Sequence, residues 1–543
     1  MAATVFEAFA ATARARADAP FLHVEEVTAA AYGIAVETLS YAALLARVEQ
    51  VAARYRAAGV GHGHRAGLLT ENRPAFFVHW FALNSLGASV VPIHRDMRAA
   101  ELEYLVGHSE IVLAVSLPDR AALLRDAARA AGRKVAIIGL EDEVDLPPLS
   151  TTAPHAGRLP GSDSECALLY TSGTTGRPKG CVLANDYYLR AGRWYAAAGG
   201  ACALAPAGER MATPLPLTHM NAMAYSVMAM IVTGGCLIQL DRFHPETWWQ
   251  SVRASGATVV HYLGVMPAML LNAPVAPADR QHAVRFGFGA GVDRRHHANF
   301  EERFGFPLIE GWAMTETGAG AVVVANEEPR LVGQASLGRA GSAMQWRLVD
   351  EDGQDVPTGS NGELLVRAAG PDPRAGFFRE YLKDAEATAA AWQGGWFHTG
   401  DLVRADDQGN LFFIDRKKNV IRRSGENISA VEVESVLATF AGVKAVAVAA
   451  TPDALRGDEV AALVVTQEAL DDAARADFAA ALTRHALLRL SYFKAPGWVA
   501  FVDALPLTPS QKIARGDLRS IARGLADLPG TIDTRALKKR PAD

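Results

Sequence analysis

Residues Leu168 to Gly180 read LLYTSGTTGRPKG, and this stretch decides how the rest of the chain is interpreted. Two apolar residues and Tyr170 lead into hydroxyl-bearing residues and glycines, and the stretch ends in Arg177-Pro178-Lys179-Gly180. Glycine adopts backbone angles that other residues resist, so successive N–H groups can point into one concavity and bind phosphate oxygens. The P-loop pattern GxxxxGK[ST] does not fit, because Pro178 and Gly180 stand where it requires glycine and a hydroxyl residue. The stretch therefore predicts a phosphate-binding loop of another kind, in preference to a merely flexible loop.

The composition is that of an ordinary globular enzyme. A chain of 543 residues is too long for one compact core, and half of its residues are hydrophobic. The net charge of −5 gives no sign of a nucleic-acid surface, and the basic group Lys538-Lys539-Arg540 is expected in a solvated tail. The cysteines lack CxxC spacing, which predicts free thiols and no zinc site: Cys166, Cys181, Cys202 and Cys236. Free thiols fit a reducing cytoplasm.

Neither the N-terminus nor the most apolar segment of the chain has the pattern of a targeting or membrane segment. The first residues have no basic start followed by an apolar stretch, so no secretory signal is expected. The uncharged segment Ala222 to Leu240 contains Thr233-Gly234-Gly235, which would break a helix. It predicts a buried helix, a turn and a core strand. We therefore expect no membrane partner and a cytoplasmic location.

The order of patterns predicts an α/β fold with two domains. Residues 1–414 alternate helical and strand patterns, which indicates a large N-terminal domain of layered α/β subdomains with largely parallel sheets. Closely spaced turn signals between Met344 and Val403 indicate a β-rich, antiparallel portion. Residues 415–418 predict a hinge, and 419–523 a small, mobile α+β domain in which Ser429 and Glu432 form a capping box. A C-terminal tail is expected over 524–543.

The loop strongly resembles the phosphate loop of the adenylate-forming enzymes, which include acyl-CoA synthetases, adenylation domains of peptide synthetases, and luciferases. Five further segments resemble motifs of the same family in the same order: 214–219, 289–291, 311–317, 396–401 and 506–513. The resemblance implies ATP, Mg²⁺ and CoA as cofactors and a carboxylic acid as the small-molecule substrate. A homodimer is a further expectation from the family.

The resemblance assigns nucleotide-binding roles residue by residue. The phosphate loop would use Thr171, Ser172, Gly173, Thr174, Thr175, Gly176 and Lys179. The strip Gly289, Ala290 and Gly291 would let adenine lie flat, and Trp312, in place of the usual Tyr, would stack on it. Thr315 would reach the α-phosphate and Glu316 would hold Mg²⁺. The two ribose hydroxyls would bind Asp401, with Arg416 also reaching the ribose.

Catalytic and CoA-facing residues follow from the same resemblance. Lys512 would bridge the substrate carboxylate and the α-phosphate, although Gln511 replaces the usual glycine before it. The C-terminal domain would swing on Lys418 between the two half-reactions. It would then present a CoA-facing turn and a CoA-nucleotide contact: Ser424, Gly425 and Glu426, with Phe493 and Lys494.

The acyl pocket is less well determined. Its candidate residues are His219, Met220, Asn221, Tyr225, Tyr262, Leu263, Gly264 and Val265, together with Gly289 and Trp312, and His219 would border the carboxylate. They predict a mixed polar and apolar cavity of modest size. Ala313 replaces the family's usual glycine and is expected to narrow this cavity slightly.

These features favour an AMP-forming acyl-CoA synthetase that acts on a small or medium carboxylic acid. The stretch 220–225 has no acidic residue to hold an α-ammonium, which argues against an amino-acid-activating domain. A luciferase-type oxygenase and a ligase with another acceptor, either a carrier protein or an amine, stay open. A nucleotide-binding pseudoenzyme is the alternative of another class, but Lys512, Glu316 and Asp401 are all present.

Overall fold

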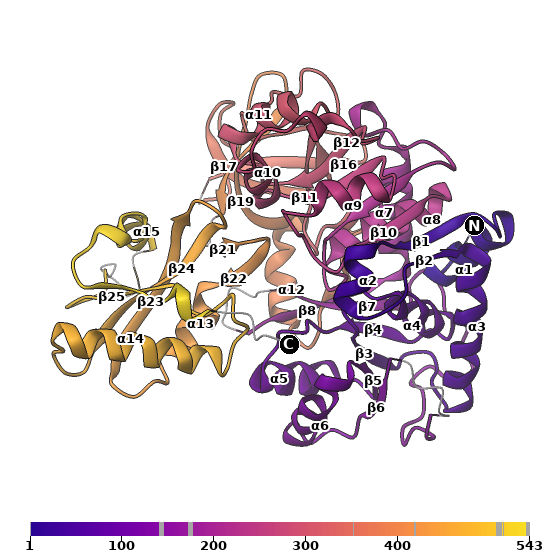
Figure 1. Cartoon of the computed structure of the whole chain (residues 1–543), viewed down its shortest axis with the longest axis horizontal. Coiled ribbons are helices and arrows are strands. Elements are labelled where there is room, and N and C mark those ends of the chain that lie inside the picture. Colours follow the sequence, from indigo (N-terminus) through magenta and orange to yellow (C-terminus); the bar gives the residue numbers. More distant parts are fainter. Residues whose placement is uncertain are drawn as a thin grey trace. The chain divides into compact units, whose positions relative to one another are not determined.

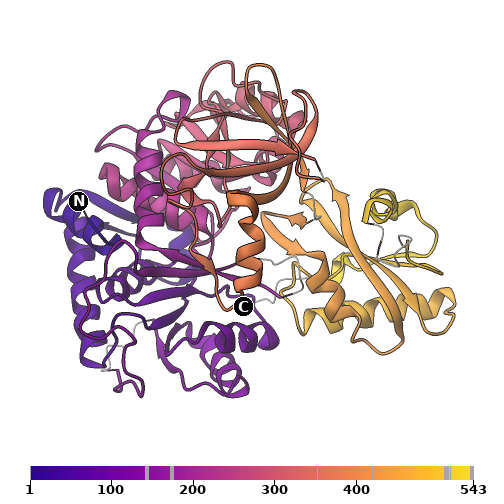
Figure 2. The same ribbon diagram turned by 180° about the vertical axis from the view of Figure 1, so that it is seen from behind.

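The computed structural model describes residues 2–140, 146–171, 177–350, 352–416, 420–506, 513 and 515–538. The chain forms two compact units, traced from both sides in Figures 1 and 2. The first unit contains Met1–Arg95, Val106–Leu169 and Gly180–Ile414. The second contains Asp96–Leu105, Tyr170–Lys179 and Asp415–Asp543.

A seven-stranded sheet carries the phosphate-loop sequence. Its order is β18 (Glu380–Tyr381), β8 (Lys179–Ala184), β7 (Glu165–Thr171), β4 (Ser89–Pro92), β3 (Arg65–Leu69), β5 (Leu113–Ser116) and β6 (Ala136–Gly139). Strands β7, β4, β3, β5 and β6 run parallel, as their short apolar runs predict for strands covered on both faces. The helices along this part of the chain are α3 (Tyr41–Ala57), α4 (Pro74–Ser85), α5 (Ala99–Ser109) and α6 (Ala121–Ala130).

A thirteen-stranded sheet forms the rest of the first unit. Its largely parallel half contains β13 (Leu308–Trp312), β12 (Phe286–Ala290), β11 (Val259–Leu263), β9 (Arg210–Thr213), β10 (Cys236–Gln239), β1 (Pro20–Val24) and β2 (Glu37–Ser40). Its antiparallel half contains β16 (Met344–Val349), β17 (Asn361–Ala368), β19 (Phe397–Ala405), β20 (Asn410–Arg416), β15 (Ser336–Ala340) and β14 (Val323–Val324). The predicted β-rich portion between Met344 and Val403 is thus confirmed.

The segment Ala222 to Leu240 shows how sequence and structure agree and differ. The expected buried helix, turn and strand are present as α8 (Met228–Thr233), Gly234 and β10, and Gly234 takes a left-handed φ of 69°. Before α8, however, Asn221–Val227 forms a π-helix, here η3, which the apolar pattern did not reveal. Among the described residues, the chain has no helix with the length and apolar character that crossing a bilayer requires.

The remaining helices of the first unit flank these strands or connect them. They are α1 (Val5–Ala15), α2 (Glu26–Tyr32), α7 (Asn185–Ala197), α9 (Trp248–Ala254), α10 (Val265–Leu271), α11 (Arg294–Phe304) and α12 (Ala385–Ala391). The large core includes a cluster of aromatic rings in which Phe9 stacks on Phe81 with centroids 4.6 Å apart. All four cysteines are free and buried, as expected.

The C-terminal part of the second unit is an α+β domain. Its elements are β21 (Val420–Arg423), β22 (Glu426–Ser429), α13 (Ala430–Leu437), β23 (Val443–Asp453), β24 (Gly457–Thr466), α14 (Asp472–Leu487), β25 (Trp498–Phe501), α15 (Arg515–Arg523) and β26 (Thr531–Asp533). The order β22-β21-β24-β25-β26, with β23 beside β24, makes one sheet. The α/β fold with a small α+β domain is confirmed, and α13 begins directly after Ser429 as predicted.

One expectation about the end of the chain is wrong. Lys538 was placed in a solvated tail, yet its side chain is buried and pairs with Glu459. The reason is that β26 pairs with β25 and brings the following residues back onto the domain. Lys539 and Arg540 lie outside the described residues.

Candidate functional site

The predicted nucleotide and acyl segments of the first unit meet at one edge of the large sheet. Strands β9, β11, β12 and β13 lie side by side and run parallel. Residues 214–219 follow β9. Residues 262–265 span the end of β11, 289–291 span the end of β12, and 312–316 begin at the last residue of β13. Ligands of open α/β sheets bind outside the carboxyl ends of the strands. Four motif segments that are far apart in the sequence therefore lie at the same edge of the sheet.

The glycines at this edge are required by close backbone approach. A Cβ on Gly289 would lie 2.3 Å from the carbonyl oxygen of Tyr262, its neighbour in the β11–β12 register. A Cβ on Gly264 would lie 1.7 Å from the carbonyl oxygen of Gly291. Neither position can hold a larger residue without moving a strand end, so the Gly289-Ala290-Gly291 strip remains a narrow ledge.

A buried carboxylate that the sequence reasoning missed fixes this ledge. Glu310 on β13 accepts hydrogen bonds from the amides of Gly291 at 2.9 Å and Val292 at 3.2 Å. It also accepts one from the Tyr262 hydroxyl at 2.6 Å, so that hydroxyl is directed to Glu310. Burial raises the pKa of the Glu310 carboxyl, against the opposing effect of these donors. One side chain thus joins the predicted adenine strip to the predicted acyl-pocket wall.

Trp312 and Asp401 form a second fixed pair. The indole N–H of Trp312 donates to Oδ2 of Asp401 at 2.8 Å, and both residues are buried. Asp401 lies on β19, where its own amide donates to the Thr399 hydroxyl at 3.0 Å. The indole therefore orients the carboxylate predicted to bind ribose.

Glu316 is held by a hydroxyl from a distant segment. The Tyr381 hydroxyl donates to Oε1 of Glu316 at 2.9 Å, and the Phe378 amide donates to the Glu316 carbonyl at 2.9 Å. Burial and the Glu316 charge raise the pKa of Tyr381, so the phenol stays protonated as a donor. The neighbouring Thr315 carbonyl accepts from the Tyr187 hydroxyl at 2.9 Å. Tyr381 is a further residue that sequence reasoning missed.

The predicted acyl-pocket residues lie on two sides of this edge. Met220 precedes the π-helix η3, which contains Asn221 and Tyr225. Helices of this kind are rare and recur at functional sites. The Tyr225 hydroxyl donates to the Gly318 carbonyl at 3.0 Å, while the His219 amide donates to the Pro216 carbonyl at 3.0 Å. On the other side, Leu263 closes β11, and Gly264 and Val265 open α10.

The two ends of the phosphate loop belong to the second unit. Thr171 closes β7 and Lys179 opens β8, while Ser172, Gly173, Thr174, Thr175 and Gly176 lie outside the described residues. Within this unit the Tyr104 hydroxyl donates to the Pro178 carbonyl at 2.9 Å. The Arg177 guanidinium lies 5.3 Å from the centre of the Tyr104 ring. Tyr104 therefore holds the returning end of the loop, a contact that motif spacing could not reveal.

The predicted CoA-facing residues are on the C-terminal domain. Ser424 and Gly425 form the turn between β21 and β22 with φ of 51° and 87°, and Glu426 opens β22. Lys494 donates to Glu432 at 2.8 Å and to Glu101 of the same unit at 2.9 Å, and Phe493 beside it is buried. Burial lowers the pKa of Lys494, but the two carboxylates outweigh it and the net shift is upward. Arg416 closes β20; Lys418 and Lys512 lie outside the described residues.

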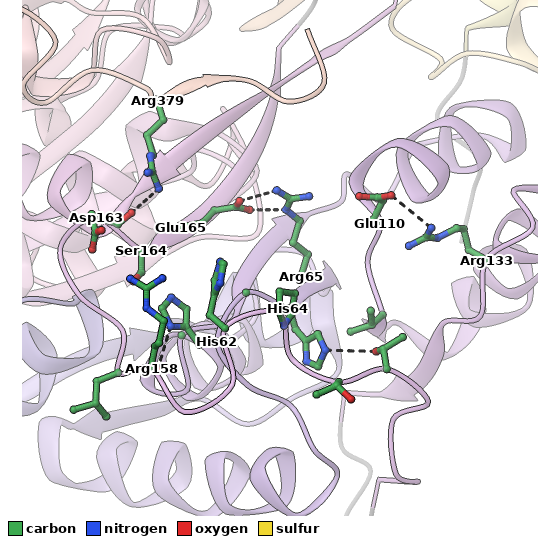
Figure 3. Close-up of a pocket in the computed structure, with 18 residues that line it drawn as sticks. His62, His64, Arg65, Glu110, Arg133, Arg158, Asp163, Ser164, Glu165 and Arg379 are labelled. Carbon is green, nitrogen blue, oxygen red and sulfur yellow. Dashed lines mark hydrogen bonds and ion pairs between the residues drawn. The ribbon is translucent and has the colours of Figure 1, made fainter. Parts of the chain in front are cut away.

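A separate pocket of about 720 Å³ lies at the amino ends of β3, β4, β5 and β7, the edge opposite to Thr171 (Figure 3). Arg65 and Glu165 face each other there, with two hydrogen bonds of 2.7 and 2.8 Å. The His155 amide donates to the His62 carbonyl at 3.0 Å, and the two rings lie 5.0 Å apart. None of the predicted site residues lines this pocket. In the part of the chain that the structure describes, no group of three or more His, Cys, Asp or Glu side chains could hold a metal ion.

Comparisons with known proteins agree with this geometry. Residues 9–382 match the family model described as AMP-binding enzyme, and residues 432–512 match the AMP-binding enzyme C-terminal domain. The chain is 34% identical over 485 residues to a sulfoacetate–CoA ligase of Cupriavidus necator, covering 88% of this chain and 91% of the relative. It is 29% identical over 497 residues to a crotonobetaine/carnitine–CoA ligase of Salmonella typhimurium, covering 89% and 93%.

Solved structures have the same fold. An o-succinylbenzoate CoA synthetase from Bacillus subtilis superposes with a TM-score of 0.80 at 22% identity, over 94% of this chain and 98% of that one. An amide bond synthetase from Marinactinospora thermotolerans gives a TM-score of 0.78 at 22% identity, over 94% and 99%. Taken with the sequence motifs and their convergence at one sheet edge, these matches show that the chain belongs to the AMP-binding enzyme family, within the adenylate-forming superfamily.

Proposed function

We propose that the chain is an ATP-dependent acid–CoA ligase, which joins AMP to a carboxylic acid and then passes the acyl group to the thiol of CoA. The observation that carries this proposal is the convergence of the Tyr262, Gly289 and Trp312 segments at the carboxyl edge of adjacent parallel strands. The curated relatives described above are acid–CoA ligases, which supports CoA as the acceptor.

The nucleotide would lie along the Gly289-Ala290-Gly291 ledge. Gly289 and Gly291 have no side chains, so a planar base could approach the backbone there, and the Glu310 carboxylate holds the ledge through the Gly291 amide. Asp401 would accept the hydrogen bonds of the ribose hydroxyls. Because Trp312 already donates to Oδ2, the carboxylate is oriented before the nucleotide arrives, which reduces the ordering that binding requires.

The loop from Thr171 to Lys179 would bind the phosphates, and Thr315 and Glu316 of the first unit are further candidates for phosphate and metal contacts. One buried carboxylate together with phosphate oxygens and water is the donor set that Mg²⁺ commonly uses, so Glu316 fits a magnesium ligand. When bound, Mg²⁺ would supply positive charge that offsets the phosphate charge. Tyr381 would keep the Glu316 carboxylate in one orientation.

The reaction would proceed in two displacements. A carboxylate oxygen of the acid attacks the α-phosphorus of ATP, and the bond to pyrophosphate breaks, which gives the acyl-adenylate. Lys512 would offset the negative charge that gathers between the two anions; loss of one such group costs about 3–4 kcal/mol in similar sites. The CoA thiol, after losing its proton, then attacks the acyl carbon, and AMP leaves with the electron pair of the broken C–O bond.

The acid is proposed to be small or medium in size. The pocket wall from Met220 to Tyr225 combines an amide and a phenol with apolar side chains, and no acidic residue lies in that stretch. The relatives point to small polar acids, since their names give sulfoacetate and crotonobetaine or carnitine as substrates.

The test is pyrophosphate release with ATP and Mg²⁺ against a panel of acids, each with and without CoA. The panel contains sulfoacetate, crotonobetaine, carnitine, and short aliphatic, medium-chain, aromatic and phenylpropanoid acids. Turnover of one acid that rises sharply with CoA supports the proposal. Turnover that is indifferent to CoA indicates another acceptor, such as an amine or a carrier protein, and no turnover with any acid favours a nucleotide-binding protein.

A further inference from the structure

A buried charge cluster lies within the C-terminal domain, outside the residues assigned above. Glu459 on β24 is fully buried, and each of its carboxylate oxygens lies 2.9 Å from Nε of Arg423 at the end of β21. The Val460 amide donates to the same carboxylate at 2.8 Å. The Lys538 ammonium, from the segment after β26, also donates to Glu459, and its side chain is 1% exposed.

The charges in this cluster do not balance, which argues against a role in stability alone. Arg423 already matches the single charge of Glu459, and Arg456 lies 3.5 Å away as a further cation. Arg535, a further nearby cation, is paired separately with Asp533 at 2.7 Å and with Asp453 at 3.6 Å. Burying a surplus ammonium costs free energy, and an apolar residue of similar volume often stabilises such a site more. The presence of Lys538 therefore calls for another explanation.

The cluster is attached to both segments that are predicted to face CoA. Arg423 directly precedes the turn of Ser424 and Gly425, and the Ser424 amide donates to the Arg456 carbonyl at 2.9 Å. Ser424 has a φ of 51°, a left-handed conformation that is strained for a non-glycine residue and needs support from its surroundings. Lys538 Nζ also lies 3.5 Å from the carbonyl oxygen of Phe493.

The segment that supplies Lys538 follows the part of the chain that matches the family. The match to the C-terminal domain ends at residue 512. Beyond it, β26 pairs with β25, and the Thr534 amide and hydroxyl donate to the carbonyls of Gly497 and Pro496, both at 2.9 Å. These bonds fix the chain just before Lys538.

From this arrangement we propose that Lys538 and Glu459 are positioning residues for the CoA-dependent half-reaction. They brace the Ser424–Gly425 turn and the Phe493 segment, so the segment after β26 shapes the CoA-facing surface. The inference rests on the proposed function for its kinetic consequence, but the brace itself is a property of the C-terminal domain. Acyl-adenylate formation does not use this turn and is left unchanged.

The test compares Lys538→Met with Lys538→Arg in the full-length protein. Lys444→Met is the matched control, because Lys444 lies exposed on the same domain. In Lys538→Met, KM for CoA rises by about tenfold or more, which corresponds to about 1.4 kcal/mol, while pyrophosphate exchange without CoA stays within about twofold. Lys538→Arg keeps a donor toward Glu459 and shows a smaller rise. Lys444→Met shows none.

Amide hydrogen exchange of residues 420–429 gives a readout that does not depend on the reaction. These amides exchange faster in Lys538→Met than in the parent protein, because the turn has lost its support. In Lys444→Met they exchange at the parent rate. If exchange is unchanged, or if both half-reactions fall together, the brace is refuted. If exchange accelerates but no acid gives CoA-dependent turnover even in the parent protein, the brace stands and the proposed function fails.

Discussion

The hydroxyl of Tyr381 offers the sharpest test of the proposed magnesium side of the site. Substituting Tyr381→Phe removes one oxygen and leaves the ring in place, so packing against Phe378, 4.7 Å away between centroids, is retained. What is lost is the 2.9 Å hydrogen bond to Oε1 of Glu316, a buried carboxylate. The substitution therefore tests the orientation of Glu316 by this hydroxyl.

The expected magnitude follows from the charge of the acceptor. A hydrogen bond to a charged group contributes about 1.5–3 kcal/mol, against about 0.5–1.5 kcal/mol for a neutral pair. If the freed carboxylate must be reoriented to hold Mg²⁺ in the transition state, and this costs as much as the lost bond, the rate of acyl-adenylate formation falls about 10- to 150-fold. Without ligands, the free energy of unfolding of the variant is lower than that of the parent protein by about 1.5–3 kcal/mol.

The assay is ATP–pyrophosphate exchange at several Mg²⁺ concentrations, with urea unfolding of the same preparations. Tyr41→Phe is the matched control, because the buried Tyr41 hydroxyl donates only to the carbonyls of Met230 and Gly235, at 2.8 and 3.0 Å. It lowers stability but leaves the exchange rate unchanged. A Tyr381→Phe enzyme that is destabilised yet exchanges pyrophosphate at the parent rate would refute the orientation of Glu316 by Tyr381.

Three other outcomes are expected. Trp312→Phe removes the 2.8 Å hydrogen bond to Asp401 and raises KM for ATP by about 10-fold or more. A double-mutant cycle with Asp401→Asn, measured by ATP-binding calorimetry, gives a coupling energy of at least about 1 kcal/mol, and additive effects would contradict this. Burial lowers the pKa of Lys538 to about 7, so between about pH 7 and 10 the unfolded chain binds more protons than the folded chain. The free energy of unfolding measured with urea therefore rises with pH in this range, and this dependence on pH is lost in Lys538→Met. Burial also lowers the pKa of His79 to about 4 and of His261 to about 3, so between pH 6 and pH 4.5 the unfolded chain binds more protons than the folded one. The free energy of unfolding therefore falls by about 1.4 kcal/mol per pH unit for each histidine as the pH is lowered, and His261→Asn removes the contribution of one of them.

Much of the fold was readable from the sequence, because its signals are local. The β-rich portion between Met344 and Val403, the turn at Thr233-Gly234-Gly235 and the helix start after Ser429 each depend on neighbouring residues. The family and the order of the motifs were readable for the same reason. The site roles of these residues stay predictions.

The residues that were missed act across large sequence separations. Glu310 binds Tyr262 and Gly291 because three strands lie in one register, and Tyr381 reaches Glu316 from 65 residues away. The pairing of the Trp312 indole with Asp401 is likewise a tertiary contact. Lys538 was misplaced because a charged residue near a chain end is usually solvated, and only the β25–β26 pairing reveals its burial.

The contact between the Gly264 and Gly291 backbones also limits how this enzyme can change its preference over evolutionary time. No single substitution at Gly264 or Gly289 can reshape the proposed acyl pocket gradually, because the first added carbon already meets a carbonyl oxygen. Variation that leaves the fold intact must enter elsewhere, for instance at Met220, which precedes the π-helix η3, and at Asn221, which begins it. A library that randomises those two positions and keeps both glycines would sample new substrates, whereas one that randomises the glycines would sample mostly unfolded chains.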